Sequence, residues 1–171
     1  VKNMNLFKKK NYIKITPPEA QKIPEEQPKI PDGTWVKCVQ CGKTIYQKEI
    51  SEFKICPKCG GHFRMNYAER IAITCDEGSF EEFNENLSAK NPISYPGYEG
   101  IIKKAQDKSG LKDGVVTGKC TIEGYKTIIC IMDSNFMMGS MGSVVGEKIT
   151  RAFEKATDEK LPIVVFTTSG G

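Results

Sequence analysis

The run KTIICIMDSNFMMGSMGSVVGEK (residues 126–148) decides the fold of most of this chain. It opens with an almost wholly apolar segment, Lys126–Met132, which is typical of a strand buried on both faces of a sheet. A glycine-containing loop follows, and apolar residues near helical spacing then predict a helix over 146–156. The apolar run 162–166 predicts another buried strand. Strand, loop, helix and strand in this order predict a βαβ crossover.

The segments upstream of this run predict short elements that lead into the sheet. The β-rich run 115–122 is joined to 126–132 by Glu123-Gly124-Tyr125, which predicts a hairpin. Asn66 precedes a short helical segment and Glu69 follows three positions later, as in a capping box. Ser79 before the acidic segment 80–83 predicts the start of a second short helix. Residues 100–106 predict a helix that ends near Gly110.

Two cysteine knuckles lie before these elements. Cys38-Val39-Gln40-Cys41 and Cys56-Pro57-Lys58-Cys59 are separated by fourteen residues, the spacing of a four-cysteine zinc site. Each CxxC pair brings two thiolates onto one tight turn. Four thiolates fill a tetrahedral shell and leave no position for water, so we predict one structural zinc ion bound by Cys38, Cys41, Cys56 and Cys59. The alternatives that the spacing leaves open are iron, a redox dithiol pair and no metal.

The residues between and after the knuckles complete a zinc ribbon. Gly42 and Gly60 each follow a second cysteine, where positive φ lets the chain turn. The strand-forming triplets 44–46 and 53–55 predict a β-hairpin between the knuckles. His62 is the one histidine of the sequence, and we expect it to pack beside the ribbon because four thiolates already complete the site.

The three remaining cysteines, Cys75, Cys120 and Cys130, lack paired spacing, and we expect them to be buried as small apolar side chains. None has a histidine nearby in the sequence that would suggest a nucleophile.

Composition places the chain in the cytoplasm and does not require nucleic acid. Its 25 Lys and Arg residues against 21 Asp and Glu residues give a net charge of +4. The polar, proline-containing segment 1–33 cannot bury a core, so we expect a disordered or extended tail. No run approaches the roughly 20 apolar residues of a membrane span, and no secretory signal is visible. The seven cysteines therefore belong to a reducing compartment, where disulfides are disfavoured.

Two small-residue segments are candidates for binding a substrate. Gly139, Ser140, Met141 and Gly142 belong either to a tight loop with packed methionines or to a ligand-facing loop at a helix N-terminus. The segment Ser169-Gly170-Gly171 follows the last predicted strand, where α/β sheets place their ligands. Backbone N–H groups of such glycines can face a developing oxyanion.

Taken together, these segments resemble one family, the β subunits of bacterial acetyl-CoA carboxylase carboxyltransferases. The resemblance runs from about Trp35 to the last residue and covers the N-terminal portion of such a subunit. It is carried by six motifs in order, WVKCVQCG (35–42), CPKC (56–59), HFRM (62–65), DEGSF (76–80), GSMGSVVGE (139–147) and SGG (169–171).

The resemblance implies a truncated crotonase-like α/β domain over 63–171, a zinc ribbon over 34–62 and the tail over 1–33. It implies carboxyl transfer from carboxybiotin to acetyl-CoA, giving malonyl-CoA for fatty acid biosynthesis. Partners would be an α subunit in an α2β2 assembly, a biotin carboxyl carrier protein that holds the biotin, and an ATP-using biotin carboxylase. Biotin or backbone groups would do the chemistry, so no catalytic side chain is assigned.

By resemblance, Gly170 and Gly171 lie in the acyl-CoA region, and Gly139–Gly142 lies near it. A further glycine pair of the family, much of the crotonase core and much of the α-subunit interface would lie beyond Gly171, so we expect this polypeptide alone to be inactive. Related carboxyltransferases act on propionyl-CoA or other acyl-CoAs but usually lack the ribbon, so the CxxC pair favours acetyl-CoA.

Two other interpretations of the ribbon stay open at this stage. It could bind nucleic acid, because basic and aromatic side chains gather in it: Trp35, Lys37, Lys43, Tyr46, Lys48, Lys54, Lys58, Phe63 and Arg64. It could instead be a purely structural lid that zinc holds over the active-site cleft, which is the default interpretation.

Overall fold

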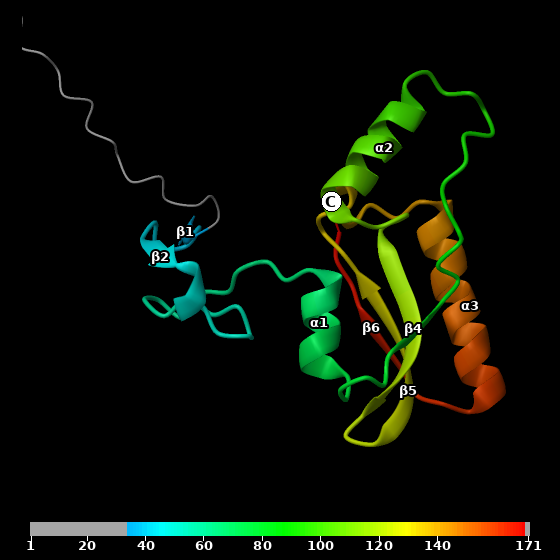
Figure 1. Cartoon of the computed structure of the whole chain (residues 1–171). Coiled ribbons are helices and arrows are strands. Elements are labelled where there is room, and N and C mark those ends of the chain that lie inside the picture. The colour runs from blue at the N-terminus through cyan, green and yellow to red at the C-terminus, as the bar shows by residue number, and fades with distance from the viewer. Residues whose placement is uncertain (1–33, 170–171) are drawn as a thin grey trace, which may run out of the picture. The chain divides into compact units, whose positions relative to one another are not determined.

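A computed structural model describes residues 34–169 of the chain as two small sheets, with three α-helices around the larger one (Figure 1). The predicted tail 1–33 and the last two residues lie outside the described part. The described elements are β1 (Trp35–Lys37), β2 (Thr44–Tyr46), η1 (Gln47–Glu49), α1 (Tyr67–Thr74), β3 (Glu81–Phe83), α2 (Tyr98–Ser109), β4 (Val115–Ile122), β5 (Tyr125–Met132), η2 (Met137–Gly139), α3 (Ser143–Glu159) and β6 (Ile163–Phe166).

The larger sheet has the strand order β3-β4-β5-β6. β4 and β5 form the predicted antiparallel hairpin in full register, from Val115 opposite Met132 to Ile122 opposite Tyr125. β6 runs parallel to β5, with Ile128 opposite Ile163, and α3 makes the crossover between them. The predicted βαβ unit is therefore confirmed, and its loops follow the C-terminal ends of two adjacent parallel strands.

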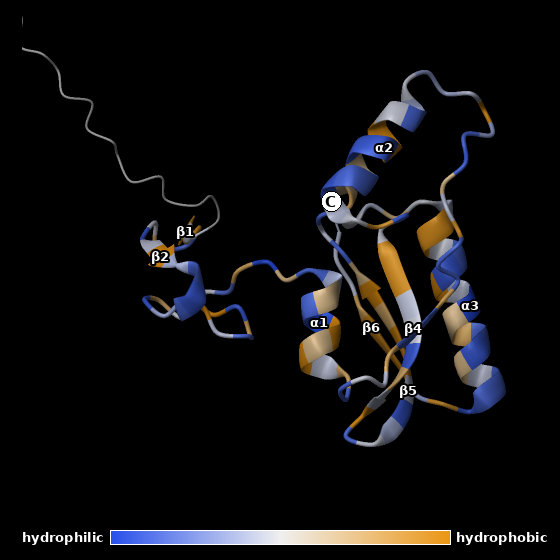
Figure 2. Ribbon diagram, in the orientation of Figure 1, coloured by the Kyte–Doolittle hydropathy of each residue, from blue (hydrophilic) through white to orange (hydrophobic). Residues whose placement is uncertain are grey.

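The central strand β5 is apolar on both faces because helices cover both of them. Ile128, Cys130 and Met132 pack with residues of α3, including Val145, Ala152 and Ala156. Ile129 and Ile131 point to the other face, where α1 contributes Ile71. In Figure 2 the strands form an apolar band between α1 and α3. Each fully buried aliphatic side chain of this kind contributes about 1.5–3 kcal/mol to folding.

The turn of the β4–β5 hairpin is held from outside by an acidic side chain. Glu123 and Gly124 both have positive φ, at 50° and 81°. The Asp76 carboxylate accepts hydrogen bonds from their backbone N–H groups at 3.0 and 2.8 Å. These donors lower the pKa of Asp76, together with a hydrogen bond involving Thr121, which is the largest cause.

Three expectations from the sequence were wrong in detail. Residues 81–83 are a strand, since β4 offers an open edge and Ser79 accepts from Thr121 N at 3.1 Å instead of capping a helix. Thr44–Tyr46 pairs with Trp35–Lys37, not with 53–55, which makes just one bridge, Ile55 to His62. β6 was expected to be buried but is half-buried along its length.

The other three predicted helices are present as α1, α2 and α3, and the last two extend beyond their expected bounds. Asn66 accepts from Glu69 N at 2.9 Å and Glu69 accepts from Asn66 N at 3.0 Å, which confirms the capping box of α1. α2 ends at Gly110, whose φ of 73° provides the C-cap. Within residues 34–169, no helix has the length and apolar character needed to cross a membrane.

Candidate functional site

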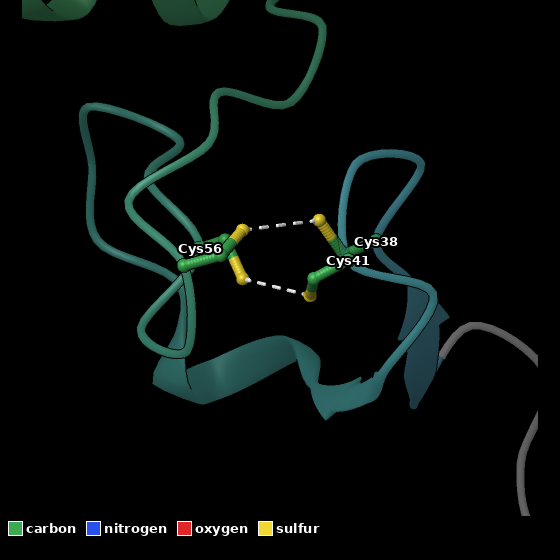
Figure 3. A group of neighbouring side chains, drawn as sticks. Cys38, Cys41 and Cys56 are labelled. Atoms are coloured by element: carbon green, nitrogen blue, oxygen red, sulfur yellow. Dashed lines mark hydrogen bonds between the residues drawn. The ribbon is translucent and has the colours of Figure 1, made fainter.

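The thiol groups of Cys38, Cys41, Cys56 and Cys59 all lie within 4.8 Å of one another. Figure 3 shows the two knuckles facing each other, with Cys38 and Cys41 on one side and Cys56 on the other. Sγ of Cys38 lies 3.8 Å from Sγ of Cys59, and Sγ of Cys41 lies 4.0 Å from Sγ of Cys56. Within the described residues, no other group of His, Cys, Asp and Glu side chains converges in this way.

The backbone folds each knuckle in the same manner. Gly42 N donates to Cys38 O, and Gly60 N donates to Cys56 O, both at 2.9 Å. Both glycines have positive φ, at 70° and 73°, as the sequence predicted. Ile45, 1% exposed, forms the small apolar centre with the buried Cys38 and Cys56. This core is too small to hold the ribbon by itself, so the fold depends on what binds the thiols.

The donor set fits zinc in both chemistry and arrangement. Backbone N–H of Cys41, then that of Gln40, favour the thiolate of Cys38 and lower its pKa to about 7 despite burial. At Cys59 the N–H of Gly61 favours the thiolate, but the hydrogen bonds that the Cys59 S–H donates to neighbouring sulfurs, first Cys56, and burial raise the pKa to about 12. Thiols this close together cannot all ionise without a cation between them. Zinc is a divalent cation that binds thiolates well, so it fits this donor set.

A second candidate site lies where the loops after β5 and β6 meet. Met137, Met138 and Gly139 have consecutive positive φ values of 45°, 59° and 78°. This left-handed run is uncommon for non-glycine residues and bends the loop sharply. A Cβ on Gly139 would lie 2.3 Å from Thr168 Cγ2 and 3.0 Å from the Thr168 backbone, so the two loops are in direct contact. Gly142 then forms the N-cap of α3, without a side-chain cap.

A cavity of about 470 Å³ opens beside these loops. Ile131, Met132 and Phe166 from the ends of β5 and β6 line it, with Ser134, Thr167 and Thr168 after them. Arg64 and Arg70 provide positive charge, and the Arg70 guanidinium lies 4.8 Å above the Phe166 ring. An apolar wall with convergent polar groups and two cations suits an anionic ligand that has an uncharged reactive end.

Part of this arrangement was predicted from the sequence. The structure brings Gly139 against Thr168, next to the predicted Ser169, whereas Gly170 and Gly171 lie outside the described residues. Ser140 and Met141 are exposed, with Met141 at 67%.

Arg64, Arg70 and Phe166 line the cavity but were not predicted as residues of a substrate site, although Arg64 was named as a basic residue of the ribbon. His62 was expected to pack beside the ribbon, but it is exposed and also lines the cavity. The position of Arg70 within α1 did not predict a role in the site. Only the folded domain brings α1 beside β6 and so places Arg70 at the cavity.

The three other cysteines do not form a site. Cys120 and Cys130 are buried as expected, and burial raises the pKa of the Cys120 thiol to about 12 and of the Cys130 thiol to about 11. Cys75 is half-buried and packs against the same apolar cluster as Cys120. The thiols of Cys120 and Cys130 are therefore poor nucleophiles at neutral pH.

Fold and site define an enzyme-like α/β domain that follows a four-cysteine zinc ribbon. The carboxyl transferase domain family matches residues 64–171, and the acetyl-CoA carboxylase zinc finger domain matches residues 35–59. The chain therefore belongs to the carboxyl transferase domain family, which has the crotonase-like fold expected from the sequence. The predicted domain boundaries at 33/34 and 62/63 stay predictions.

Similar proteins agree with this assignment. The chain is 54% identical over 168 residues to the acetyl-coenzyme A carboxylase carboxyl transferase subunit beta of Clostridium novyi, covering 97% of this chain and 58% of that protein. The subunit of the same name from Carboxydothermus hydrogenoformans is 49% identical, with 98% of this chain and 58% of that protein covered. The chain thus spans 58% of the length of both relatives.

Solved structures give the same fold. The transcarboxylase 12S crystal structure with hydrolysed methylmalonyl-coenzyme A bound is 27% identical with a TM-score of 0.54, and covers 63% of this chain and 19% of that chain. The same enzyme with methylmalonyl-coenzyme A and methylmalonic acid bound gives 28% identity and a TM-score of 0.52, with the same coverage. These similarities favour a carboxyl transferase over a nucleic-acid-binding ribbon protein.

Proposed function

We propose that this chain forms part of the β subunit of the carboxyltransferase of an acetyl-CoA carboxylase. Its reaction would move a carboxyl group from carboxybiotin to acetyl-CoA and give malonyl-CoA. The observation that carries the proposal is the contact between Gly139 and Thr168, which joins the loops after two parallel strands beside the cavity. The names of the similar subunits support the choice of acetyl-CoA.

The cavity has the chemistry that a thioester of coenzyme A requires. Phosphate groups carry negative charge, and Arg64 and Arg70 are the cations that line the cavity. The acyl end is uncharged, and Ile131 and Phe166 offer an apolar wall to it. Backbone N–H groups of the 139–142 and 169–171 segments are the proposed donors to the thioester oxygen.

In the reaction, the acetyl methyl group loses a proton and forms a C–C bond to the carboxyl carbon. The bond from that carbon to the biotin nitrogen breaks, and the nitrogen takes up the proton. Negative charge gathers on the thioester oxygen in between, where a preorganised N–H donor is worth about 3–4 kcal/mol. No ionisable side chain of this chain is needed for the proton transfer, in keeping with the absence of a predicted catalytic residue.

The zinc ribbon would have a structural role in this scheme. Zinc bound by Cys38, Cys41, Cys56 and Cys59 holds the segment that follows β2, which includes Phe53, His62 and Phe63 on the wall of the cavity. Lys54 of the same segment forms an ion pair of 2.6 Å with Glu69 of α1. The proposed partners are an α subunit, a biotin carboxyl carrier protein and a biotin carboxylase, in the cytoplasm.

The test is carboxyl transfer in the reverse direction, from malonyl-CoA to biocytin, by the assembled carboxyltransferase that contains this chain. We expect biocytin-dependent consumption of malonyl-CoA, and loss of it when Gly139→Ala pushes the two loops apart. Gly146→Ala is the matched control, because a Cβ there meets nothing within 4 Å. An assembled complex that consumes no malonyl-CoA, or one indifferent to Gly139→Ala, would overturn the proposal.

A further inference from the structure

Lys148 of α3 is buried to 2% exposure, which is rare for a lysine. Its Nζ donates to the carbonyl oxygen of Val115 at 3.1 Å and lies 3.9 Å from Oε1 of Glu82. The buried Asp113, 6% exposed, attracts the same ammonium. Three segments, α3, the start of β4 and β3, therefore converge on one cation. A cavity of about 140 Å³ adjoins the group.

Electrostatics within this cluster are balanced. Burial lowers the pKa of Lys148, and the carboxylates of Glu82 and Asp113 act in the opposite direction. Burial likewise raises the pKa of Glu82 and of Asp113. Lys112 and Glu85 also act on the ammonium, with opposite signs. The cluster therefore depends on holding its members together, because each charge would be unfavourable without the others.

Packing alone does not explain a lysine at residue 148. Apolar residues of similar volume often replace buried ion pairs without loss of stability. The Lys148 ammonium does something that an apolar side chain cannot do. β3 pairs with β4 from Lys119 to Thr117, so Val115 lies beyond the end of β3, and Lys148 donates to its carbonyl oxygen there.

The start of β4, to which Lys148 donates, packs against the chain around the 139–142 loop. Gly114 O accepts from Asp133 N at 3.0 Å. A Cβ on Gly114 would lie 3.4 Å from both Phe136 Cδ1 and Val145 Cγ2, and 3.8 Å from Ser140 O. Gly114 thus contacts the segment 133–145, which includes the 139–142 loop, near both of its ends. Through its hydrogen bond to the next residue, Val115, Lys148 links α3 to this part of the chain.

We propose that Lys148 is a positioning residue: its ammonium, shared by Val115 O, Glu82 and Asp113, fixes the N-terminal turns of α3 and thereby the backbone of the 139–142 loop. The role of that loop in substrate binding rests on the proposed function. The positioning of the loop rests on the contacts themselves, so it can be measured independently.

The key variant is Lys148→Met, which keeps the length of the side chain and removes the charge. Lys155→Met is the matched control, since Lys155 lies on the same helix with a side chain 41% exposed. In the assembled carboxyltransferase, we expect Lys148→Met to unfold cooperatively but to lose at least about tenfold in kcat/KM for malonyl-CoA, a change of ~1.4 kcal/mol. Lys155→Met should stay within about twofold of the unmodified enzyme.

Hydrogen exchange provides the second readout. We expect amides of 139–146 to exchange faster in Lys148→Met, and ribbon amides to exchange as before. This readout does not need activity, so it separates failure of this proposal from failure of the proposed function. Unchanged exchange in the loop would overturn the positioning role, whatever the value of kcat/KM.

The double variant Lys148→Met/Glu82→Gln excludes a trivial cause. It removes the carboxylate of Glu82, one of the two that Lys148→Met leaves without their cation. If the lost bond to Val115 O displaces the loop, the double variant stays slow and its loop amides stay exposed to exchange. Recovery of both readouts would mean that an unpaired carboxylate caused the defect, and the proposal would fall.

Discussion

Gly139 and Thr168 are packed so closely that the smallest possible side chain at residue 139 would overlap Thr168, with Cβ 2.3 Å from Cγ2. Twenty-nine positions separate the two residues in the sequence, and the α3 crossover lies between them. The contact therefore reports how accurately the parallel pair β5–β6 brings its two following loops together. One added methyl group at residue 139 is therefore enough to disturb the proposed substrate site.

Gly139→Ala is expected to destabilise the domain and to weaken binding of a coenzyme A thioester. The new Cβ meets backbone atoms of Thr168 at 3.0 Å, and the φ of 78° disfavours alanine as well. We expect a loss of about 1–3 kcal/mol in the free energy of unfolding, measured by urea denaturation. Calorimetric titration with acetyl-CoA measures the binding. Gly146→Ala, within α3, should be neutral or stabilising by up to about 1 kcal/mol.

Removal of zinc is expected to unfold the ribbon while leaving the α/β domain folded. The ribbon fully buries little besides Ile45, Cys38 and Cys56, so metal binding of about 10–16 kcal/mol supplies its stability. One zinc per chain should be found by atomic emission, and Cys56→Ser should abolish it. Cys75→Ser, outside the cluster, should keep the full zinc content. Retention of zinc by Cys56→Ser would contradict the assignment of the ligands.

Asp133→Asn is expected to loosen the loop after β5. The carboxylate, 1% exposed, accepts from Tyr67 N at 2.9 Å and from Asn135 N at 2.8 Å, and so links the first residue of α1 to the loop. An amide would present an NH2 group to one of these donors. We expect a loss of about 2 kcal/mol in unfolding free energy and faster amide exchange at Tyr67 and Asn135.

Asp107→Asn is the control for Asp133→Asn. Its carboxylate pairs with Lys103 on the exposed surface of α2, at 3.1 Å. Such pairs contribute less than about 1 kcal/mol, so unfolding should change little. Equal effects of the two substitutions would show that Asp133 does not hold the loop.

The features that the sequence predicted are those that local spacing controls. Cysteine spacing within a knuckle, the Asn66–Glu69 capping box and the apolar run of β5 each depend on residues a few positions apart. Residues 81–83 were misjudged because their conformation depends on the open edge of β4, which lies more than thirty positions away in the sequence. Acidic residues after a serine favour a helix locally, and the hydrogen bonds of the sheet outweigh that preference.

The same distinction applies to the candidate site. Gly139 was selected as part of a glycine-containing loop before a predicted helix, and Ser169 as a small residue after a predicted strand, and local sequence carries both patterns. Arg70 and Lys148 were not, because nothing in a lysine or arginine on a helix tells which side will be buried against a distant strand. Lys148 in particular follows Glu147 in a segment that looks solvated, yet it is 2% exposed.

Glu159, at the C-terminal end of α3, should contribute to the loss of stability of the domain as the pH falls. It forms ion pairs with Lys119 of β4 and, at 2.8 Å, with Lys155. Hydrogen bonds with Lys119 and then with Lys155 lower the pKa of Glu159 to about 2. In the unfolded chain a glutamate has a pKa of about 4.3, so the unfolded state takes up a proton first as the pH falls.

The contribution of Glu159 to stability is therefore complete above pH of about 5 and is lost as the pH falls from there to about 2. We expect Glu159→Gln to lower the free energy of unfolding at neutral pH, with the difference from the unmodified protein vanishing near pH 2. Urea unfolding across this range measures it, with Glu154→Gln as the control for removing a carboxylate from α3. An electrostatic contribution of Glu159 to the free energy of unfolding must disappear when the carboxylate is protonated. A difference for Glu159→Gln that persists unchanged in acid would therefore mean that the glutamate stabilises the domain by packing.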